Sequence, residues 1–493
     1  KLGYQDMPYQ YYPNQRMDLL DNEATRFNVR YQGQFDSLVL DVRAYHEDVD
    51  HFMDFGPDKR YWYGSASGGP TVPYGSPCSP VSPTCATGMP MYTESSTDGA
   101  SLKADWMLSD SDLLRLGAEM QAYTIDDWWP PSGAMMWPEV FWNVNNGQRD
   151  RAAVFGEWES KPSEAWTTLF GLRFERVSMN ADEVRGYDVV AAPPGSFMMT
   201  NADATAFNAA ERARDDNNLD ATALARYHGS DALDVEFGLA RKVRSPNVYE
   251  RYSWSKWEMA AVMNNFVGDG NGYVGNLNLE PEVAYTASAT LDWHAADRAW
   301  ELKATPYITR VSDFIDATRL TNNANRFNVL RYINQDARLY GLDLSGKLEL
   351  GETAFGKLAI KTVVTHTDGT NLDTDDALYN IMPLNGRIGL SQQIGRWDNL
   401  IEWVGVTAKD DISDARNEIK TKGYGLVNLR ASYVADTFRL DVGIDNIFDR
   451  NYDLPLGGAY VAQGTTMSIN AIPWGIAVPG MGRSLYAGVN ISF

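Results

Sequence analysis

Hydrophobic and polar residues alternate along this chain with a period of two. The last ten residues show the pattern clearly, with one face formed by Leu485, Ala487, Val489, Ile491 and Phe493. The same alternation recurs in 38–47, 427–433 and 438–445. Successive side chains of a β-strand point to opposite faces, so the pattern predicts strands with one apolar and one polar side. Amphipathic helices of comparable clarity are not evident anywhere.

The connections between these strands alternate in length. Short connections are expected at 33–36, 110–112, 161–163, 295–297 and 435–436. Long ones, rich in Gly, Pro, Asn and Trp, are expected at roughly 54–98, 127–149, 180–218, 245–281, 315–328 and 452–482. Short turns at one end and long loops at the other are typical of a transmembrane barrel. We therefore predict an all-β, antiparallel transmembrane barrel with about 17 strands in this chain.

The predicted strand count also bears on where the chain begins. A closed up-and-down barrel needs an even number of strands. The first predicted strand, 22–33, ends in a short turn, whereas the last follows a long loop, and residues 1–21 are expected on the long-loop side. The N-terminus lacks the pattern of a signal peptide, so the protein is either cytosolic or starts downstream of its true beginning. The strand parity favours an N-terminally truncated barrel.

Composition excludes several classes of protein. The 493 residues contain 43 Lys+Arg and 65 Asp+Glu, a net charge of −22, which excludes nucleic-acid binding by a broad basic surface. Stretches of 18 or more apolar residues do not occur, which argues against helical membrane spans. The cysteines Cys78 and Cys85 lie in a Pro/Ser-rich segment and favour a loop disulfide in an oxidising compartment. A pair of free thiols is the alternative.

Four internal segments resemble one family in order and spacing. They are Arg244–Tyr252 (RSPNVYERY), Asn276–Glu282 (NLNLEPE), Asp336–Leu344 (DARLYGLDL) and Asp445–Tyr452 (DNIFDRNY). Together with the terminal Phe493, they resemble the TonB-dependent receptors of the Gram-negative outer membrane. The resemblance covers nearly the whole chain and implies one barrel domain, 1–493.

The family resemblance has consequences for architecture and partners. It implies a barrel of about 22 strands that surrounds an N-terminal plug carrying a TonB box. A plug-like segment is not evident here, so the plug and the first strands are expected to be missing. The implied partners are outer-membrane lipid and, through the missing plug, the TonB complex.

A candidate metal site lies in one predicted strand. In Asp50-His51-Phe52-Met53-Asp54, the i, i+2 spacing directs His51 and Met53 to the barrel interior, whereas His46 has the opposite parity. Imidazole and thioether together suit Cu(I), although two ligands do not complete a site. By composition alone, one His and one Met at a strand end are ordinary lumen residues. The pair nevertheless resembles the barrel half of TonB-dependent copper receptors, whose H-x-M faces a C-x-x-x-M on the plug.

Further methionines and acids could serve the same cation. Met89 and Met91 flank Pro90 and are candidate auxiliary copper contacts, and Met135/Met136, Met198/Met199 and Met259/Met263 form other pairs. The alternative is that these methionines fill gaps between packed loops. Acids expected in loops, which could attract cations or simply be solvated, are Asp126/Asp127, Asp215/Asp216, Asp373/Asp375/Asp376 and Asp410/Asp411.

Three functional hypotheses follow. The first is an outer-membrane receptor that takes up copper, and the second is a receptor of the same fold for a siderophore or other metal chelate. The third is a secreted all-β binding protein or glycosidase. Enzymatic motifs such as H-E-x-x-H, G-x-S-x-G and the P-loop are absent from the sequence, so we expect neither an enzyme nor a catalytic cofactor. The Trp-rich loops could stack a ligand, but they are better explained by loop packing or by the membrane interface.

Overall fold

The computed structural model describes residues 1–55, 90–131, 139–187, 198–462, 469–470 and 472–491. Within these ranges the chain forms 19 strands and three helices. The strands are β1 Leu2–Asp6, β2 Asp18–Phe35, β3 Leu38–Asp54, β4 Met91–Met107, β5 Asp112–Trp129, β6 Phe141–Ser163, β7 Trp166–Asn180, β8 Arg214–Ser230, β9 Leu233–Arg244, β10 Gly272–Val274, β11 Glu282–His294, β12 Trp300–Arg319, β13 Val329–Thr353, β14 Gly356–Asn371, β15 Asn385–Ile394, β16 Trp397–Val406, β17 Tyr424–Val434, β18 Phe438–Asp445 and β19 Ser484–Ile491. The helices are α1 Met198–Asn208, α2 Val248–Tyr252 and α3 Glu258–Met263.

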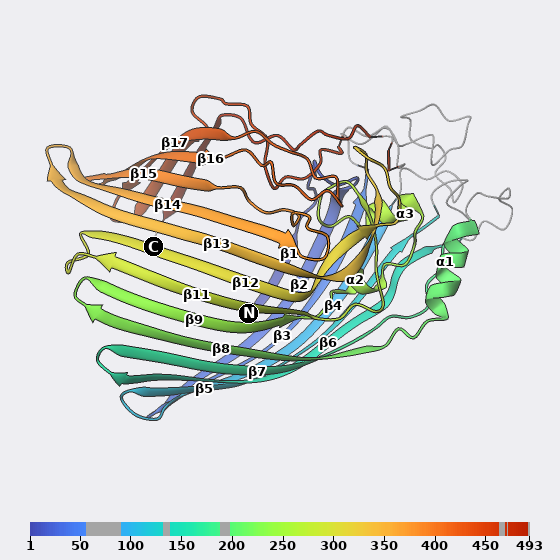
Figure 1. Cartoon of the computed structure of the whole chain (residues 1–493), viewed down its shortest axis with the longest axis horizontal. Coiled ribbons are helices and arrows are strands. Elements are labelled where there is room, and N and C mark those ends of the chain that lie inside the picture. The colour runs from blue at the N-terminus through green and yellow to red at the C-terminus, as the bar shows by residue number, and fades with distance from the viewer. Residues whose placement is uncertain (56–89, 132–138, 188–197, 463–468, 471, 492–493) are drawn as a thin grey trace.

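Seventeen strands form one continuous antiparallel meander. From β2 to β9 and from β11 to β19, each strand pairs with the next one along the chain, and β9 pairs directly with β11. Figure 1 shows the short turns at one end of this curved sheet, with the long connections and the helices at the other. The alternation of connection lengths and the strand number of the meander are therefore as predicted.

The start of the chain differs from the prediction. Leu2–Asp6 is not on the long-loop side but forms β1, antiparallel to β2, with Leu2 opposite Phe27 and Asp6 opposite Glu23. The next strand, β2, begins at Asp18 rather than at residue 22. The alternation in a strand of five residues is too short to stand out in the sequence, so β1 was missed. Adding β1 to the seventeen strands of the meander makes the strand number even, so strand parity no longer indicates a truncated barrel.

Two long connections contain regular structure that we did not predict. The connection from β7 to β8 contains α1, and the connection from β9 to β11 contains α2, α3 and the strand β10, which runs parallel to β13. Helix α2 starts with a capping box, in which the Asn247 side chain accepts from the Glu250 backbone and the Glu250 side chain accepts from the Asn247 backbone. Helices α2 and α3 span only one or two turns, too few for a helical period to be visible in the sequence.

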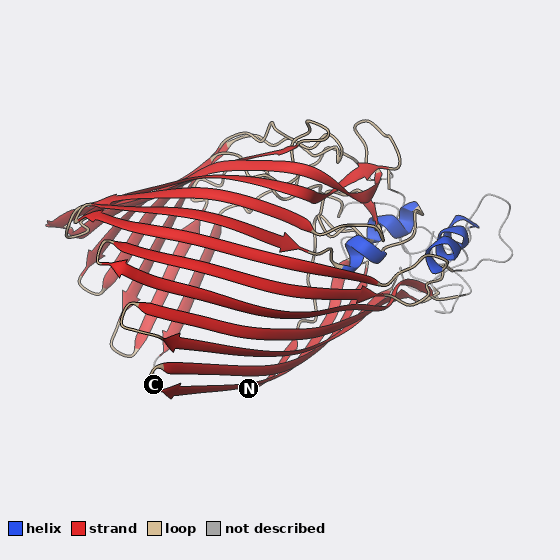
Figure 2. Cartoon of the chain, turned by 60° about the horizontal axis from the view of Figure 1, so that its bottom comes forward, coloured by secondary structure: helices blue, strands red, loops and turns tan. Residues whose placement is uncertain are grey.

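The two faces of the sheet differ as a membrane barrel requires. On β7, Phe170, Leu172 and Phe174 are 52%, 61% and 47% exposed and point outward. The intervening Arg173 points inward and forms ion pairs with Glu119 at 2.9 Å and Glu175 at 3.1 Å. Figure 2 shows the strands wrapping around the interior. Large apolar side chains exposed in such numbers are stable only against lipid, so the outer face fits a bilayer.

A hydrophobic core fills the loop end on the inner side of β5–β7. The rings of Trp129 and Phe141 stack at 4.4 Å, and Phe141 stacks on Trp254 at 5.0 Å. Trp129 and Phe141 are fully buried, and Met259–Met263 of α3 belong to the same cluster. The Trp-rich segments therefore pack against one another, as expected, and they hold the β9–β11 connection against the wall near the candidate site.

Candidate metal-binding site

The predicted ligands His51 and Met53 lie near the loop end of β3. His51 is opposite Asn22 on β2 and Thr93 on β4, and Met53 is opposite Leu19 and Met91. Residues directly opposite one another on paired strands project to the same face. Arg43, which shares the parity of His51 on β3, lines a small cavity with the inward-pointing Arg173. Both predicted ligands therefore face inward, as the spacing predicted.

His46 lies on the other face. It is opposite Phe27, which is half exposed on the outer surface. Its two ring nitrogens lie 2.8 Å from carboxylate oxygens of Asp98 and Asp48. Both nitrogens are therefore occupied by carboxylates, and His46 is not part of the inner site.

One hydrogen bond sets the orientation of the His51 ring. Its Nδ1 lies 3.0 Å from Oδ1 of Asn22, which can only accept, so Nδ1 carries the proton and donates. The other nitrogen, Nε2, then carries the lone pair and is the atom able to bind a metal. A neutral imidazole fixed by its second nitrogen is the usual arrangement of a metal-ligating histidine.

Two methionines occupy the next inward-facing register pair after His51. Met53 and Met91 are register partners on β3 and β4, and both border the hydrophobic core at the loop end. Met91 is buried, whereas Met53 is partly buried against the core. The structure thus brings together three of the four predicted metal contacts, His51, Met53 and Met91, on neighbouring strands.

A buried carboxylate continues the same row of inward-facing residues, and its role was not predicted from the sequence. Asp127 is opposite Thr93 and is buried. It accepts hydrogen bonds from Asn143 Nδ2 at 2.7 Å, Tyr249 Oη at 3.1 Å and Trp129 Nε1 at 3.2 Å. Burial, with the adjacent Asp127 carboxylate, holds the pKa of Tyr249 well above its ordinary value. The Tyr249 hydrogen bond ties α2 to the wall beside the candidate ligands, whereas the other two donors come from β5 and β6.

The hydrophobic core around the site contains further methionines. Met17, Met179, Met259 and Met263 are all buried in the cluster that includes Met91. Of these, only Met259 and Met263 stand out as a pair in the sequence. Met17 lies just before β2 and shows no recognisable motif, so only the fold reveals its place. All four pack as core residues, which favours the gap-filling interpretation for them.

Several predicted residues fall outside the described ranges. Met89, Cys78 and Cys85 lie in 56–89, and Met135 and Met136 lie in 132–138. The auxiliary role of Met89 and the Cys78–Cys85 disulfide therefore stay predictions. The side chains of Met198 and Met199 also lie outside the described set.

Two of the predicted acidic loops are strand residues instead. Asp126 and Asp127 belong to β5, and Asp215 and Asp216 belong to β8. Asp216 is buried and pairs with Arg251 at 3.3 Å, so neither it nor the buried Asp127 is solvated. Both strands continue beyond the expected apolar band, and this longer reach explains the difference.

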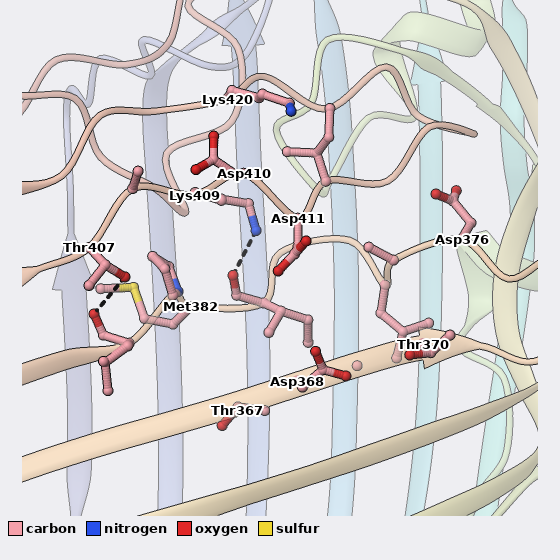
Figure 3. A pocket seen from close by; sticks show the side chains of 18 of the residues that line it. Thr367, Asp368, Thr370, Asp376, Met382, Thr407, Lys409, Asp410, Asp411 and Lys420 are labelled. Carbon is pink, nitrogen blue, oxygen red and sulfur yellow. Dashed lines mark hydrogen bonds between the residues drawn. The ribbon is translucent and has the colours of Figure 1, made fainter.

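Four of the other predicted acids, Asp375, Asp376, Asp410 and Asp411, line a cavity of about 560 Å³ above the ends of β15 and β16. Asp373 does not line it and accepts from the Asp336 backbone at 2.8 Å. Figure 3 shows Asp368, Asp410 and Asp411 there around Lys409, whose ammonium donates to the Ile381 carbonyl at 2.6 Å. Lys409 also pairs with Glu418 at 3.2 Å, and both are buried. Asp376 accepts from the Asp414 and Ala415 backbones at 2.8 and 2.9 Å. Several of these charges therefore hold two loops together.

The described ranges contain no group of three or more His, Cys, Asp or Glu side chains that could hold a metal ion. A metal at His51 and Met53 would consequently rely on thioethers and on ligands from elsewhere. Among the described residues, no helix is long and apolar enough to span a membrane.

The comparisons identify the class to which this fold belongs. Residues 2–447 match the family model described as "TonB dependent receptor-like, beta-barrel", so the chain belongs to the TonB-dependent receptor family. Its members are transporters rather than enzymes, and they lie in the outer membrane of Gram-negative bacteria. Both statements agree with the sequence analysis. Family membership also rules out the secreted binding protein or glycosidase.

Solved structures with the same fold belong to transporters of different metals. The copper transporter OprC has a TM-score of 0.74 and 21% sequence identity, over 100% of this chain and 68% of its own. The ferric citrate transporter FecA, in its unliganded form, has a TM-score of 0.65 and 14% sequence identity, over 99% of this chain and 66% of its own. The FrpB iron transporter from Neisseria meningitidis has a TM-score of 0.61 and 15% identity, over 97% of this chain and 63% of its own. This chain thus spans about two thirds of each, and a search of curated proteins finds no match.

Proposed function

We propose that this chain forms the barrel of an outer-membrane receptor that takes up copper ions into the periplasm. The main supporting observation is one imidazole whose Nε2 has no partner among the described residues, on the inner wall next to the register pair of two methionines. His51 and Met53 would be the barrel-side ligands, and Met91 an auxiliary one. The similarity to a copper transporter supports this choice of metal, although at 21% identity it establishes only the fold.

The chemistry of this ligand set favours copper over hard cations. Thioethers are soft ligands that select Cu(I), whereas Mg²⁺, Ca²⁺ and Mn²⁺ prefer carboxylates, carbonyls and water. The neighbouring carboxylate of Asp127 already accepts three hydrogen bonds, so it is not available as a hard ligand. By family resemblance, further ligands would come from an N-terminal plug, which would also couple the receptor to TonB.

The test uses the intact receptor, purified from outer membranes after exposure to copper. Elemental analysis is expected to find about one tightly bound copper per chain and its loss in a His51→Ala/Met53→Ala double variant. Met120→Ala is the matched control, since Met120 is 61% exposed on the outer face. Heat-modifiable migration on a detergent gel verifies that each variant forms a barrel.

The opposite result separates the two receptor hypotheses. Equal copper in the wild type and in the double variant, or none in either, would overturn the copper proposal. The receptor for a siderophore or other metal chelate would then be the better explanation, in line with the iron transporters that share this fold.

A further inference from the structure

A second cavity lies at the loop end, between α1 and the connection that contains α2 and β10. Its volume is about 370 Å³. Four cationic side chains and two carboxylates line it: Arg214, Arg251, Lys256, Arg331, Asp203 and Glu211. In a chain with a net charge of −22, a cavity with an excess of positive charge is unusual and needs an explanation.

Among the described residues, ion pairs neutralise only two of these cations. Lys256 pairs with Asp203 at 3.1 Å, and Arg251 pairs with Asp216 at 3.3 Å. Arg214 instead donates to neutral acceptors, among them the Leu277 carbonyl at 2.8 Å and Oδ1 of Asn278 at 3.2 Å. Two guanidinium groups, those of Arg214 and Arg331, thus have no carboxylate partner in the described part of the chain.

Unsatisfied polar atoms occur at the same cavity. The Ser253 side chain is 2% exposed, and its hydroxyl has no hydrogen-bond partner among the described residues. Nε of Arg331 and Nε of Arg251 are likewise buried without a partner. Leaving a buried donor unsatisfied is unfavourable, because the group gives up its hydrogen bonds to water. Three such groups at one cavity indicate that an acceptor belongs there.

The wall that carries these groups is held rigidly. Arg244 pairs with Glu250 of α2 at 2.8 Å and with Glu282 of β11 at 2.6 Å. Gly275 packs so closely against the end of α2 that a Cβ there would lie 2.8 Å from the Ser253 carbonyl oxygen. Only glycine allows this close approach. The cavity is therefore formed before any ligand arrives.

We propose that this cavity binds a phosphate monoester. Arginine forks match phosphate oxygens, and a tetrahedral anion can meet donors from separate elements, unlike a planar carboxylate. The cavity is larger than a phosphate group alone, and Phe207, Trp254 and Leu277 supply an apolar side for the organic part of the ester. The source of the phosphate is either a free ester or a phosphorylated sugar of outer-leaflet lipid. This site is separate from the copper site.

The experiment measures ligand binding to the intact receptor in detergent. Glucose 1-phosphate is titrated calorimetrically, with unphosphorylated glucose and sodium chloride of equal ionic strength as the blanks. We expect saturable binding of glucose 1-phosphate only, weakened at least about tenfold in Arg331→Gln and in Arg214→Gln, which corresponds to about 1.4 kcal/mol. The control is Arg338→Gln, an exposed arginine of β13 that makes no ion pair within the described residues.

Either of two results would overturn this proposal. One is the absence of saturable binding in the wild type, and the other is an unchanged affinity in both cavity variants that retain heat-modifiable migration. Adding lipopolysaccharide distinguishes the sources, because competition assigns the cavity to lipid-borne phosphate and its absence to a free ester. Copper content is measured in parallel and is expected to be the same in all variants.

Discussion

Met53 and Met91 face each other across the β3–β4 pair, two residues beyond His51, although 37 residues separate them in the chain. Directly opposed Cβ atoms in an antiparallel pair are about 4.5–5.5 Å apart. Two flexible thioethers at that separation can reach one soft metal ion together with the imidazole nitrogen. The copper proposal rests on this arrangement, and it gives the first prediction.

Met91→Leu should weaken copper binding by about tenfold, because it removes a soft ligand and keeps the apolar volume. Since Leu and Met are similar in volume, the change should cost less than about 1.5 kcal/mol of stability. Competition with a Cu(I) chelator measures the affinity, and thermal unfolding in detergent measures the stability. Met120→Leu on the outer face is the control. An unchanged affinity in Met91→Leu would remove Met91 from the site.

Asn22→Leu should weaken copper binding through His51 without touching the metal. The Asn22 oxygen holds the proton on Nδ1, and loss of such an orienting partner typically costs about 10–100-fold in metal affinity. Asn22→Asp keeps an acceptor oxygen at this position and should restore binding. If Asn22→Leu and Asn22→Asp bind copper equally well, the hydrogen bond does not position the ligand.

Trp254→Ala should loosen the loop end of the barrel. Trp254 stacks on Phe141 and donates from Nε1 to the Trp142 carbonyl at 2.9 Å. Replacing a buried aromatic residue by alanine typically costs about 3–5 kcal/mol. Limited proteolysis of the folded receptor should then cut the β9–β11 connection faster than in the wild type. The control is Phe448→Ala, which removes an exposed aromatic ring and should leave the cleavage rate unchanged.

Leu172→Arg and Val363→Arg should differ sharply, although the two side chains are 61% and 50% exposed. Leu172 faces outward, whereas Val363 faces inward, in register with Arg387. An arginine on the lipid face costs up to about 2–4 kcal/mol near the bilayer midplane, but an arginine inside the barrel does not meet lipid. The yield of heat-modifiable protein in outer membranes should fall only for Leu172→Arg. Equal yields would contradict the assigned faces.

The period of two was enough to predict the meander, because it follows from the backbone alone. Each side chain of a strand points opposite to its neighbours, so a barrel wall with lipid on one side requires apolar and polar residues to alternate in the sequence. The faces of His51, Met53 and His46 were predictable for the same reason. Helix α2, by contrast, is only five residues long, and its capping box Asn247/Glu250 lies within a family motif that we interpreted as a loop.

The tertiary structure alone decided which distant residues meet. Register between strands depends on the whole set of pairings, so the opposition of Met53 to Met91 and of Thr93 to Asp127 could not be read from local pattern. Burial of Asp127 likewise depends on α2 folding back against β5, a contact between residues 122 positions apart. The sequence by itself thus determined that the chain forms an antiparallel transmembrane barrel wall and which face each strand residue occupies, since both follow from local geometry. Only the folded chain determined the site, because long-range packing brings its residues together.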